Sequence, residues 1–127
     1  MKILLVDDNK SITIALSKFL KLKGHDCIVV NDGRTGLSLC LEQKFDAVIL
    51  DIAMPKFSGI DFVNMLNQSG KMHDQRIIIL SAMPFGPIDL ENSQKGISTV
   101  LQKPVDMDLL LETIEGKNRM TEPAFIK

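Results

Sequence analysis

The feature that most constrains the fold is a short run of apolar residues that ends in a carboxylate. Residues 47–50 (Ala-Val-Ile-Leu) are all apolar and lead directly into Asp51, after which the chain reaches Pro55 and Gly59. An apolar run without polar alternation is typical of a strand buried on both faces, as in a parallel sheet. Because open α/β folds bind their ligands at the carboxyl ends of such strands, we expect Asp51 to have a chemical role.

The bulk composition indicates one globular domain. The chain has 127 residues, of which 45% are apolar and 24% charged, and we expect residues 1–119 to form the domain and 120–127 a C-terminal tail. A net charge of −1 without a basic stripe argues against direct binding of nucleic acid. No apolar run has the length of a signal-peptide core or a membrane span, so we expect a cytoplasmic protein without membrane contact. Cys27 and Cys40 are expected to be buried thiols rather than a disulfide or metal ligands.

Hydrophobic periodicity predicts strands that alternate with helices along the whole chain. After the fourth strand, Pro84, Gly86 and Pro87 oppose a helix start, so we expect a short or irregular fourth helix from about residue 88 to 95. The expected strands are residues 3–6, 27–30, 47–51, 76–80 and 98–102. The other expected helices run from a cap at Asn9 or Ser11 to Gly24, over 35–43, over 59–67, and from a cap at Asp106 to Gly116.

This strict alternation predicts an α/β fold: a doubly wound five-stranded parallel sheet with right-handed crossovers and helices on both faces. The strand at 27–30 is flanked by polar residues, so we expect it near an edge of the sheet. On the second helix, Leu37, Cys40 and Leu41 are expected to face the core.

Candidate site residues lie at the ends of four of the five expected strands. Asp7 and Asp8 follow the first strand, Asp51 ends the third, Ser81 follows the fourth, and Lys103 follows the fifth. Parallel strands end at the same edge of a sheet, so we expect these side chains to share one crevice. Two like charges about 4 Å apart repel by roughly 4 kcal/mol at an effective dielectric near 20, and a divalent cation relieves that repulsion.

The ligand chemistry of this crevice favours Mg²⁺. Carboxylate oxygens without a nearby histidine or cysteine are hard ligands, which suit magnesium. A carboxylate beside a bound Mg²⁺ and the Lys103 ammonium is also placed to attack phosphorus, because both cations spread the charge of a transferring phosphoryl group.

The chain resembles, over essentially its whole length, the response-regulator receiver domains of two-component signalling, of the stand-alone chemotaxis type. The resemblance rests on Asp7-Asp8, on Asp51 within Leu-Asp-Ile-Ala-Met-Pro-Lys-Phe-Ser-Gly, on Ser81-Ala82 and on Lys103-Pro104, and on the spacing of these residues. It implies a flavodoxin-like sheet with strand order 2-1-3-4-5, the order of the chemotaxis member of that family.

The resemblance also implies the roles of the site residues. Asp51 would accept a phosphoryl group from the phosphohistidine of a histidine kinase or of a phosphotransfer protein. Asp8, Asp51 and the backbone carbonyl of Ala53 would bind Mg²⁺ directly, and Asp7 would bind it through water.

The implied role of Lys103 is to hold an oxygen of the acyl phosphate, and that of Ser81 is to move and hydrogen-bond the phosphoryl group. The resemblance further implies a small residue at Ala82, which leaves room for the phosphoryl group, and a cis peptide bond between Lys103 and Pro104.

Three features of the sequence depart from the family pattern. Val100 stands where the family usually has an aromatic residue, whose ring reports activation by turning inward. The segment 83–87 (Met-Pro-Phe-Gly-Pro) replaces the usual start of the fourth helix. Ala53 and Met83 cannot orient an attacking water by hydrogen bonding, so we expect phosphoryl-Asp51 to lose its phosphoryl group slowly.

Three rival functions remain open at this point. A phosphatase of the haloacid dehalogenase type would have a second aspartate two residues after the nucleophile, where this chain has Ala53. A nucleotide-binding fold would need a Walker A loop or a dinucleotide fingerprint, and residues 33–36 (Gly-Arg-Thr-Gly) are neither, which favours a turn and helix-packing role. The third rival is a receiver-like interaction module that works without phosphorylation, which Val100 and the altered fourth helix favour.

The expected partners are therefore a phosphodonor protein and a downstream protein effector. We expect no effector domain after residue 127, and therefore signalling by protein–protein contact and catalysis only of the protein's own phosphorylation and dephosphorylation. Lysines near the first helix are expected to form an ordinary solvated face, although an acidic partner could dock there. These residues are Lys10, Lys18, Lys21 and Lys23.

Overall fold

The computed structural model describes residues 1–52, 58–70, 76–82 and 97–116. The expected fourth helix and the expected C-terminal tail lie outside these residues. Within them the chain forms, in order, β1 (Lys2–Val6), α1 (Lys10–Leu22), β2 (Asp26–Val30), α2 (Gly33–Glu42), β3 (Ala47–Asp51), α3 (Gly59–Gln68), β4 (Arg76–Ser81), β5 (Ile97–Gln102) and α5 (Met107–Glu115).

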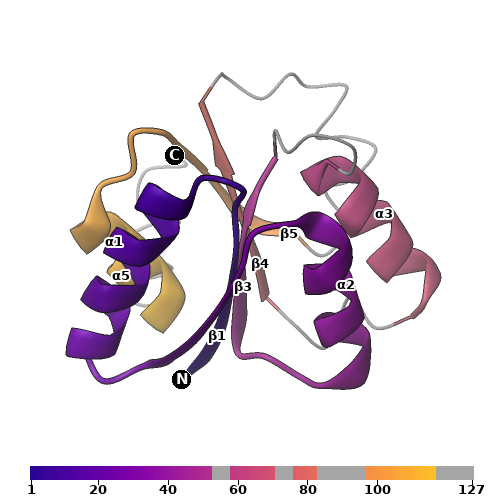
Figure 1. The fold of residues 1–127 in the computed structure, drawn as a ribbon, viewed down its shortest axis with the longest axis horizontal. Coiled ribbons are helices and arrows are strands. Elements are labelled where there is room, and N and C mark those ends of the chain that lie inside the picture. The colour runs from indigo at the N-terminus through magenta and orange to yellow at the C-terminus, as the bar shows by residue number, and fades with distance from the viewer. Residues whose placement is uncertain (53–57, 71–75, 83–96, 117–127) are drawn as a thin grey trace, which may run out of the picture.

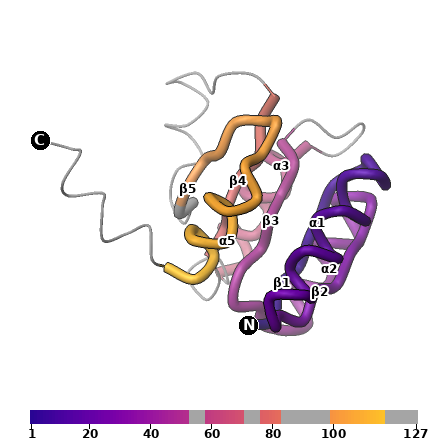
Figure 2. The backbone as a smooth tube through the Cα atoms, turned by 90° about the vertical axis from the view of Figure 1, so that its left-hand side faces the viewer, coloured from indigo at the N-terminus to yellow at the C-terminus, as the bar shows by residue number. Residues whose placement is uncertain are grey.

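The strands form one parallel sheet in the order β2-β1-β3-β4-β5. Both the parallel pairing and the strand order confirm the prediction, and β2 lies at an edge as expected. Helices cover both faces: α1 and α5 lie on one side, and α2 and α3 on the other (Figure 1). Figure 2 turns the first of these faces toward the viewer and shows α1 and α5 in front of the sheet.

Alternation along each strand divides the apolar residues between two cores. In β1, Ile3 and Leu5 point toward α1 and α5, whereas Leu4 and Val6 point toward α2 and α3. The same division holds in β3, where all five residues are buried. The central strands therefore have two apolar faces, which explains why their sequences show no alternation.

Each described helix begins with a side chain that accepts a hydrogen bond from the backbone of its first turn. Asn9 caps α1, Asp32 caps α2 and Asp106 caps α5, and Ser58 forms a reciprocal capping box with Asp61 at the start of α3. The predicted caps at Asn9 and Asp106 are confirmed.

One prediction about α2 is wrong. Leu37 and Cys40 are buried as predicted, but Leu41 is 36% exposed. The reason is Gly36, where a Cβ atom would lie 2.8 Å from Cγ2 of Val6. This close approach of helix and strand centres the buried stripe on Gly36 and Cys40 and turns Leu41 outward. It also confirms the helix-packing role predicted for residues 33–36.

The predictions for the lysines of the α1 region and for Cys40 agree with the structure, whereas Cys27, predicted to be buried, is only half-buried. The four lysines of the α1 region are exposed. Cys40 is buried and Cys27 half-buried, neither forms a disulfide, and burial raises their pKa values to about 12 and about 11. Among the described residues, no helix is long and apolar enough to span a bilayer.

Gly59 sets how closely α3 approaches the end of β3. Its backbone N–H donates to the carbonyl of Ile52 at 3.0 Å. A Cβ atom at this position would lie 2.7 Å from Cα of Ile52 and 2.9 Å from the carbonyl oxygen of Asp51. Both neighbours are backbone atoms, which cannot move aside as the end of a flexible side chain can.

We therefore expect Gly59→Ala to lower the free energy of unfolding by about 2 kcal/mol through overpacking, measured by urea denaturation. Gly70→Ala is the control, because Gly70 has a φ of +80° with open space around it. Backbone strain alone should cost that variant about 1 kcal/mol. If Gly59→Ala were as stable as the parent protein, the close approach of α3 to β3 would not affect the free energy of unfolding.

Candidate functional site

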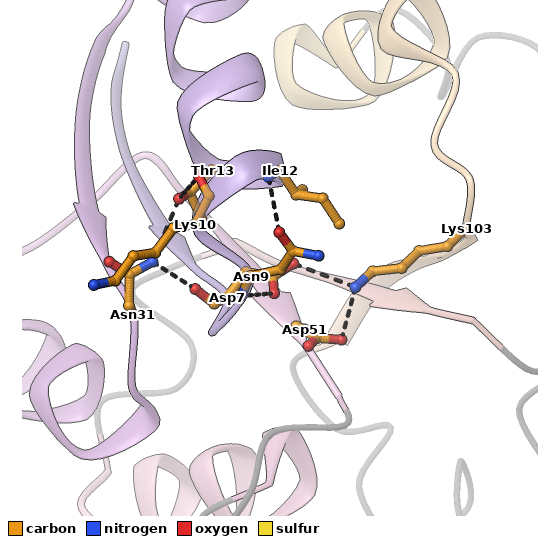
Figure 3. Close-up of polar contacts among 8 residues, drawn as sticks. All are labelled: Asp7, Asn9, Lys10, Ile12, Thr13, Asn31, Asp51 and Lys103. Carbon is orange, nitrogen blue, oxygen red and sulfur yellow. Dashed lines mark hydrogen bonds and ion pairs between the residues drawn. The ribbon is translucent and has the colours of Figure 1, made fainter.

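The carboxyl edge of the sheet gathers charged side chains from separate strands. Asp7 follows the end of β1, Asp51 is the last residue of β3, and Lys103 follows β5 (Figure 3). Asp8 comes directly after Asp7. Each strand is held in parallel register with its neighbour, so the ends meet although the residues are far apart in sequence. The predicted gathering of the three acids and Lys103 is therefore confirmed.

Lys103 lies between two buried carboxylates. Its Nζ is 3.3 Å from Oδ2 of Asp7 and 3.2 Å from Oδ1 of Asp51. Asp7 is fully buried and Asp51 is 4% exposed. Ion pairs removed from water are screened less than surface pairs, so Lys103 supplies the charge that makes burial of two acids tolerable.

The structure also brings a third acid into the cluster. Carboxylate oxygens of Asp7, Asp8 and Asp51 lie within 4.8 Å of one another, with Asp8 exposed and the other two buried. This donor set is made of hard oxygens on an open edge, which is the chemistry that Mg²⁺ selects. The residues fit such an ion, and the exposed Asp8 leaves a side through which it could enter.

Asp7 is fixed by hydrogen bonds at its backbone and at its carboxylate. Its N–H donates to the carbonyl of Val30 at 3.2 Å, and its Oδ1 accepts from the backbone N–H of Asn9 at 2.9 Å. The side-chain amide of Asn31 donates to its carbonyl at 2.8 Å. The sequence pattern around Asn31 predicts only a turn. The available signal was its position directly after β2, at the same sheet edge as the acids.

Burial and neighbouring charges shift two pKa values in the cluster. Burial raises the pKa of Asp7, and the nearby charge of Asp51 adds to the increase, while the hydrogen bond from Asn9 and the charge of Lys103 oppose it. Burial of Lys103 acts to lower its pKa, but the charges of Asp51 and Asp7 outweigh that effect and the pKa is raised. Lys103 therefore stays an ammonium.

The remaining predicted site residues are placed as follows. Ser81 ends β4, is 5% exposed, and its backbone carbonyl accepts a 2.7 Å hydrogen bond from the N–H of Lys103. The two predicted residues are thus joined through their backbones. The peptide bond between Lys103 and Pro104 is cis, as the resemblance implies. Ala53 lies outside the described residues.

An apolar cavity of about 160 Å³ adjoins the stem of Lys103. It lies between α1 and the segment that joins β5 to α5. Because an alkyl stem favours apolar surroundings and an ammonium does not, this cavity and the carboxylates together direct the charged end of Lys103 toward the acids. The cavity is lined by Ile12, Ala15, Leu16, Leu80, Lys103, Pro104, Val105 and Met107.

Comparison with known proteins gives a consistent result. A sequence model for the response regulator receiver domain matches residues 3–115. The chain is 29% identical over 123 residues to the response regulator MprA of Mycobacterium leprae, covering 97% of this chain and 53% of MprA, so it spans about half the length of that relative. It is 29% identical over 115 residues to protein PilH of Pseudomonas aeruginosa, covering 91% of this chain and 95% of PilH.

A solved structure of a response regulator has a similar fold. The response regulator protein TrrA of Thermotoga maritima, in complex with Mg²⁺-BeF, superimposes with a TM-score of 0.79 at 30% identity, covering 91% of this chain and 98% of that chain.

The raised pKa of Asp7 has a consequence for stability. The native state binds a proton at Asp7 more tightly than the unfolded chain does, so this group costs the native state stability as pH rises from about 4 through the folded pKa. Without Mg²⁺ we expect Asp7→Asn to increase the free energy of unfolding at pH 7 by about 1 kcal/mol. The increase should shrink toward zero below about pH 4, measured by urea denaturation in EDTA.

Asp26→Asn is the matched control, because Asp26 is exposed at the start of β2. Its effect should stay within about 0.5 kcal/mol. An Asp7→Asn protein that is less stable than the parent at neutral pH without metal would contradict the argument.

Proposed function

The chain belongs to the response regulator receiver domain family of two-component signalling, and from this premise we propose that it accepts a phosphoryl group on Asp51 in a Mg²⁺-dependent reaction. Phosphorylation then changes its contact with another protein. The observation that carries this proposal is the position of Lys103 Nζ, 3.2 Å from Asp51 and 3.3 Å from Asp7. One ammonium thus adjoins both the proposed acceptor and a proposed metal ligand.

Asp51 is the nucleophile in this proposal. One of its carboxylate oxygens forms a bond to phosphorus of a phosphohistidine, the phosphorus–nitrogen bond breaks, and its electron pair leaves with the donor's imidazole. Burial of Asp51 removes competing water from the reacting oxygen. The transferred group would then lie beside Lys103, which donates to a phosphoryl oxygen and offsets its charge.

Asp8, Asp51 and the backbone carbonyl of Ala53 are the proposed direct ligands of Mg²⁺, and Asp7 would bind the ion through water. When bound, the ion supplies positive charge that offsets the repulsion between acids and phosphoryl group. The proximity of the three carboxylates, within 4.8 Å, supports this assignment.

Ser81 is the proposed third contact of the phosphoryl group. Its place at the end of β4, joined through its carbonyl to the N–H of Lys103, supports a role at the same phosphoryl oxygens. A hydroxyl there can donate a hydrogen bond once the phosphoryl group is present. Val100 is half-buried against the core beneath α2 and α3, and as a β-branched aliphatic residue it has no ring that could rotate on activation. We therefore assign the coupling of phosphorylation to the surface to Ser81.

We propose that residues 1–119 form this domain, with 120–127 as a tail, and that it acts in the cytoplasm. Its partners would be a histidine kinase or phosphotransfer protein as donor and a protein effector as target, without direct contact to nucleic acid or membrane. The protein would promote only its own phosphorylation and dephosphorylation. The absence of an aromatic residue at Val100 favours one alternative, an interaction module that works without phosphorylation.

Phosphorylation distinguishes the two functions. Incubation with Mg²⁺ and acetyl phosphate should add one phosphoryl group per chain, detected by intact-protein mass spectrometry, and Mg²⁺ with beryllofluoride should shift backbone amide resonances near the site. Asp51→Asn should abolish both responses, because an amide is neither the nucleophile nor a ligand for beryllium.

Asp26→Asn, on the exposed start of β2, should respond like the parent protein. A parent protein that stays unmodified with both reagents would reject the proposed function and favour the alternative.

The lifetime of the phosphorylated form is a second test. Ala53 and Met83, both outside the described residues, cannot orient water by hydrogen bonding, so we expect phosphoryl-Asp51 to persist for minutes or longer without a phosphatase. Decay can be followed by mass spectrometry after removal of acetyl phosphate, and Ala53→Glu, which adds a group able to hydrogen-bond water, should alter the rate. A half-life of seconds in the parent protein would contradict this expectation.

A further inference from the structure

Asn31 lies at the junction of three elements that surround the proposed metal site. It follows directly after β2, and its side chain points toward the segment that joins β1 to α1 (Figure 3). Its Nδ2 donates to the carbonyl oxygen of Asp7 at 2.8 Å and to Oγ1 of Thr13 at 3.3 Å. Both hydrogens of the amide are therefore used.

The first of these bonds extends the sheet beyond the last regular pair of residues. Val6 pairs with Val30, and the N–H of Asp7 still donates to the carbonyl of Val30. In a regular parallel ladder, the next donor to the carbonyl of Asp7 would be the backbone N–H two residues after Val30. That residue, Asp32, has left the strand to cap α2. The side chain of Asn31 supplies the missing donor, so the buried carbonyl of Asp7 is satisfied.

This bond also orients the next carboxylate. The carbonyl of Asp7 and the N–H of Asp8 belong to one planar peptide unit. A donor that fixes the carbonyl oxygen fixes the rotation of that unit and thereby restricts the directions in which the side chain of Asp8 can leave the backbone. Asp8 is the exposed member of the acid cluster, so its own burial does not hold it in place.

The second bond fixes the other end of the same segment. The hydroxyl of Thr13 donates to the carbonyl of Lys10 at 3.0 Å, which leaves its oxygen free to accept from Asn31. Thr13 is buried in the first turn of α1. One amide thus connects the end of β1 to the start of α1, and the segment between them carries Asp7 and Asp8.

We propose that Asn31 is a positioning residue for the metal site: by donating to Asp7 and Thr13 it holds the Asp7–Asp8 peptide in the orientation that binds Mg²⁺. Asn31 is not itself a ligand and does not touch the phosphoryl group. The proposal rests on the proposed function, since it concerns the affinity of that same site for Mg²⁺.

The test compares Mg²⁺ affinity in two variants and two controls. Asn31→Ala removes both hydrogen bonds, and Thr13→Val removes one of them while keeping the shape of the side chain. Thr113→Val is the matched control, because Thr113 is also buried and its hydroxyl donates to its own helix, at Leu109, away from the acids. Gly70→Ala controls for a loss of stability at a distant turn.

Isothermal titration with Mg²⁺ should show binding about tenfold weaker in Asn31→Ala, the usual effect of removing a group that orients metal ligands. Thr13→Val should weaken binding by a smaller factor, and both controls should bind as the parent does. In acetyl phosphate assays, the Mg²⁺ concentration for half-maximal rate should rise by the same factor in Asn31→Ala, with a maximal rate close to that of the parent. A merely structural defect would instead lower the maximal rate.

Two other outcomes separate the possible failures. If the parent binds Mg²⁺ and is phosphorylated but Asn31→Ala binds Mg²⁺ equally well, the positioning role is rejected and the proposed function stands. If the parent binds no Mg²⁺, both are rejected. Thr13→Val keeps the test decisive should Asn31→Ala fail to fold.

Discussion

Electrostatic repulsion at the carboxyl edge of the sheet is the constraint on which the rest of the site depends. Oxygens of three carboxylates lie within 4.8 Å of one another, and two of those residues are buried. Such a cluster is stable only if positive charge and hydrogen-bond donors are supplied to it. Lys103 supplies the charge, and the N–H of Asn9 donates to Asp7. In the proposed function, a bound cation would relieve the remaining repulsion between the carboxylates and would also offset the charge of a phosphoryl group.

The fold meets this constraint by keeping the apolar residues that stabilise the sheet apart from the polar residues of the site. The central strands are apolar on both faces, and the two cores beneath α1 and α5 and beneath α2 and α3 hold the sheet together. In the three central strands, polar residues lie only at the strand ends. Close packing at Gly36 and Gly59 brings helices against the last residues of β1 and β3, so the backbone that carries Asp51 has little freedom to relax away from its neighbours. A site with strong internal repulsion requires such a rigid base.

Much of this could be predicted from single residues and their spacing. Unalternating apolar runs predicted the buried parallel strands, and the residues after them predicted the acid cluster and Lys103. The exposure of Leu41 was mispredicted because the depth of a helix depends on what it packs against, here the absence of a side chain at Gly36. Asn31 was not recognised because an Asn-Asp-Gly sequence is typical of turns, and its two acceptors come from residues 18 and 24 positions earlier in the chain.

The sequence alone therefore determined the elements, their parallel arrangement and the kinds of atoms at the strand ends, since these follow from local hydrophobicity and residue chemistry. Tertiary structure decided which of those atoms meet and how. The distances from Lys103 to two acids arise from the register of four neighbouring strands. Tertiary structure also brings the ring of His25, directly before β2, to 3.0 Å from Glu115 at the end of α5, across 90 residues of sequence. The sequence predicted that Lys103 lies near the acids but not these distances, and the contact of His25 has no sequence signal, because both depend on the relative placement of elements that only the packed cores fix.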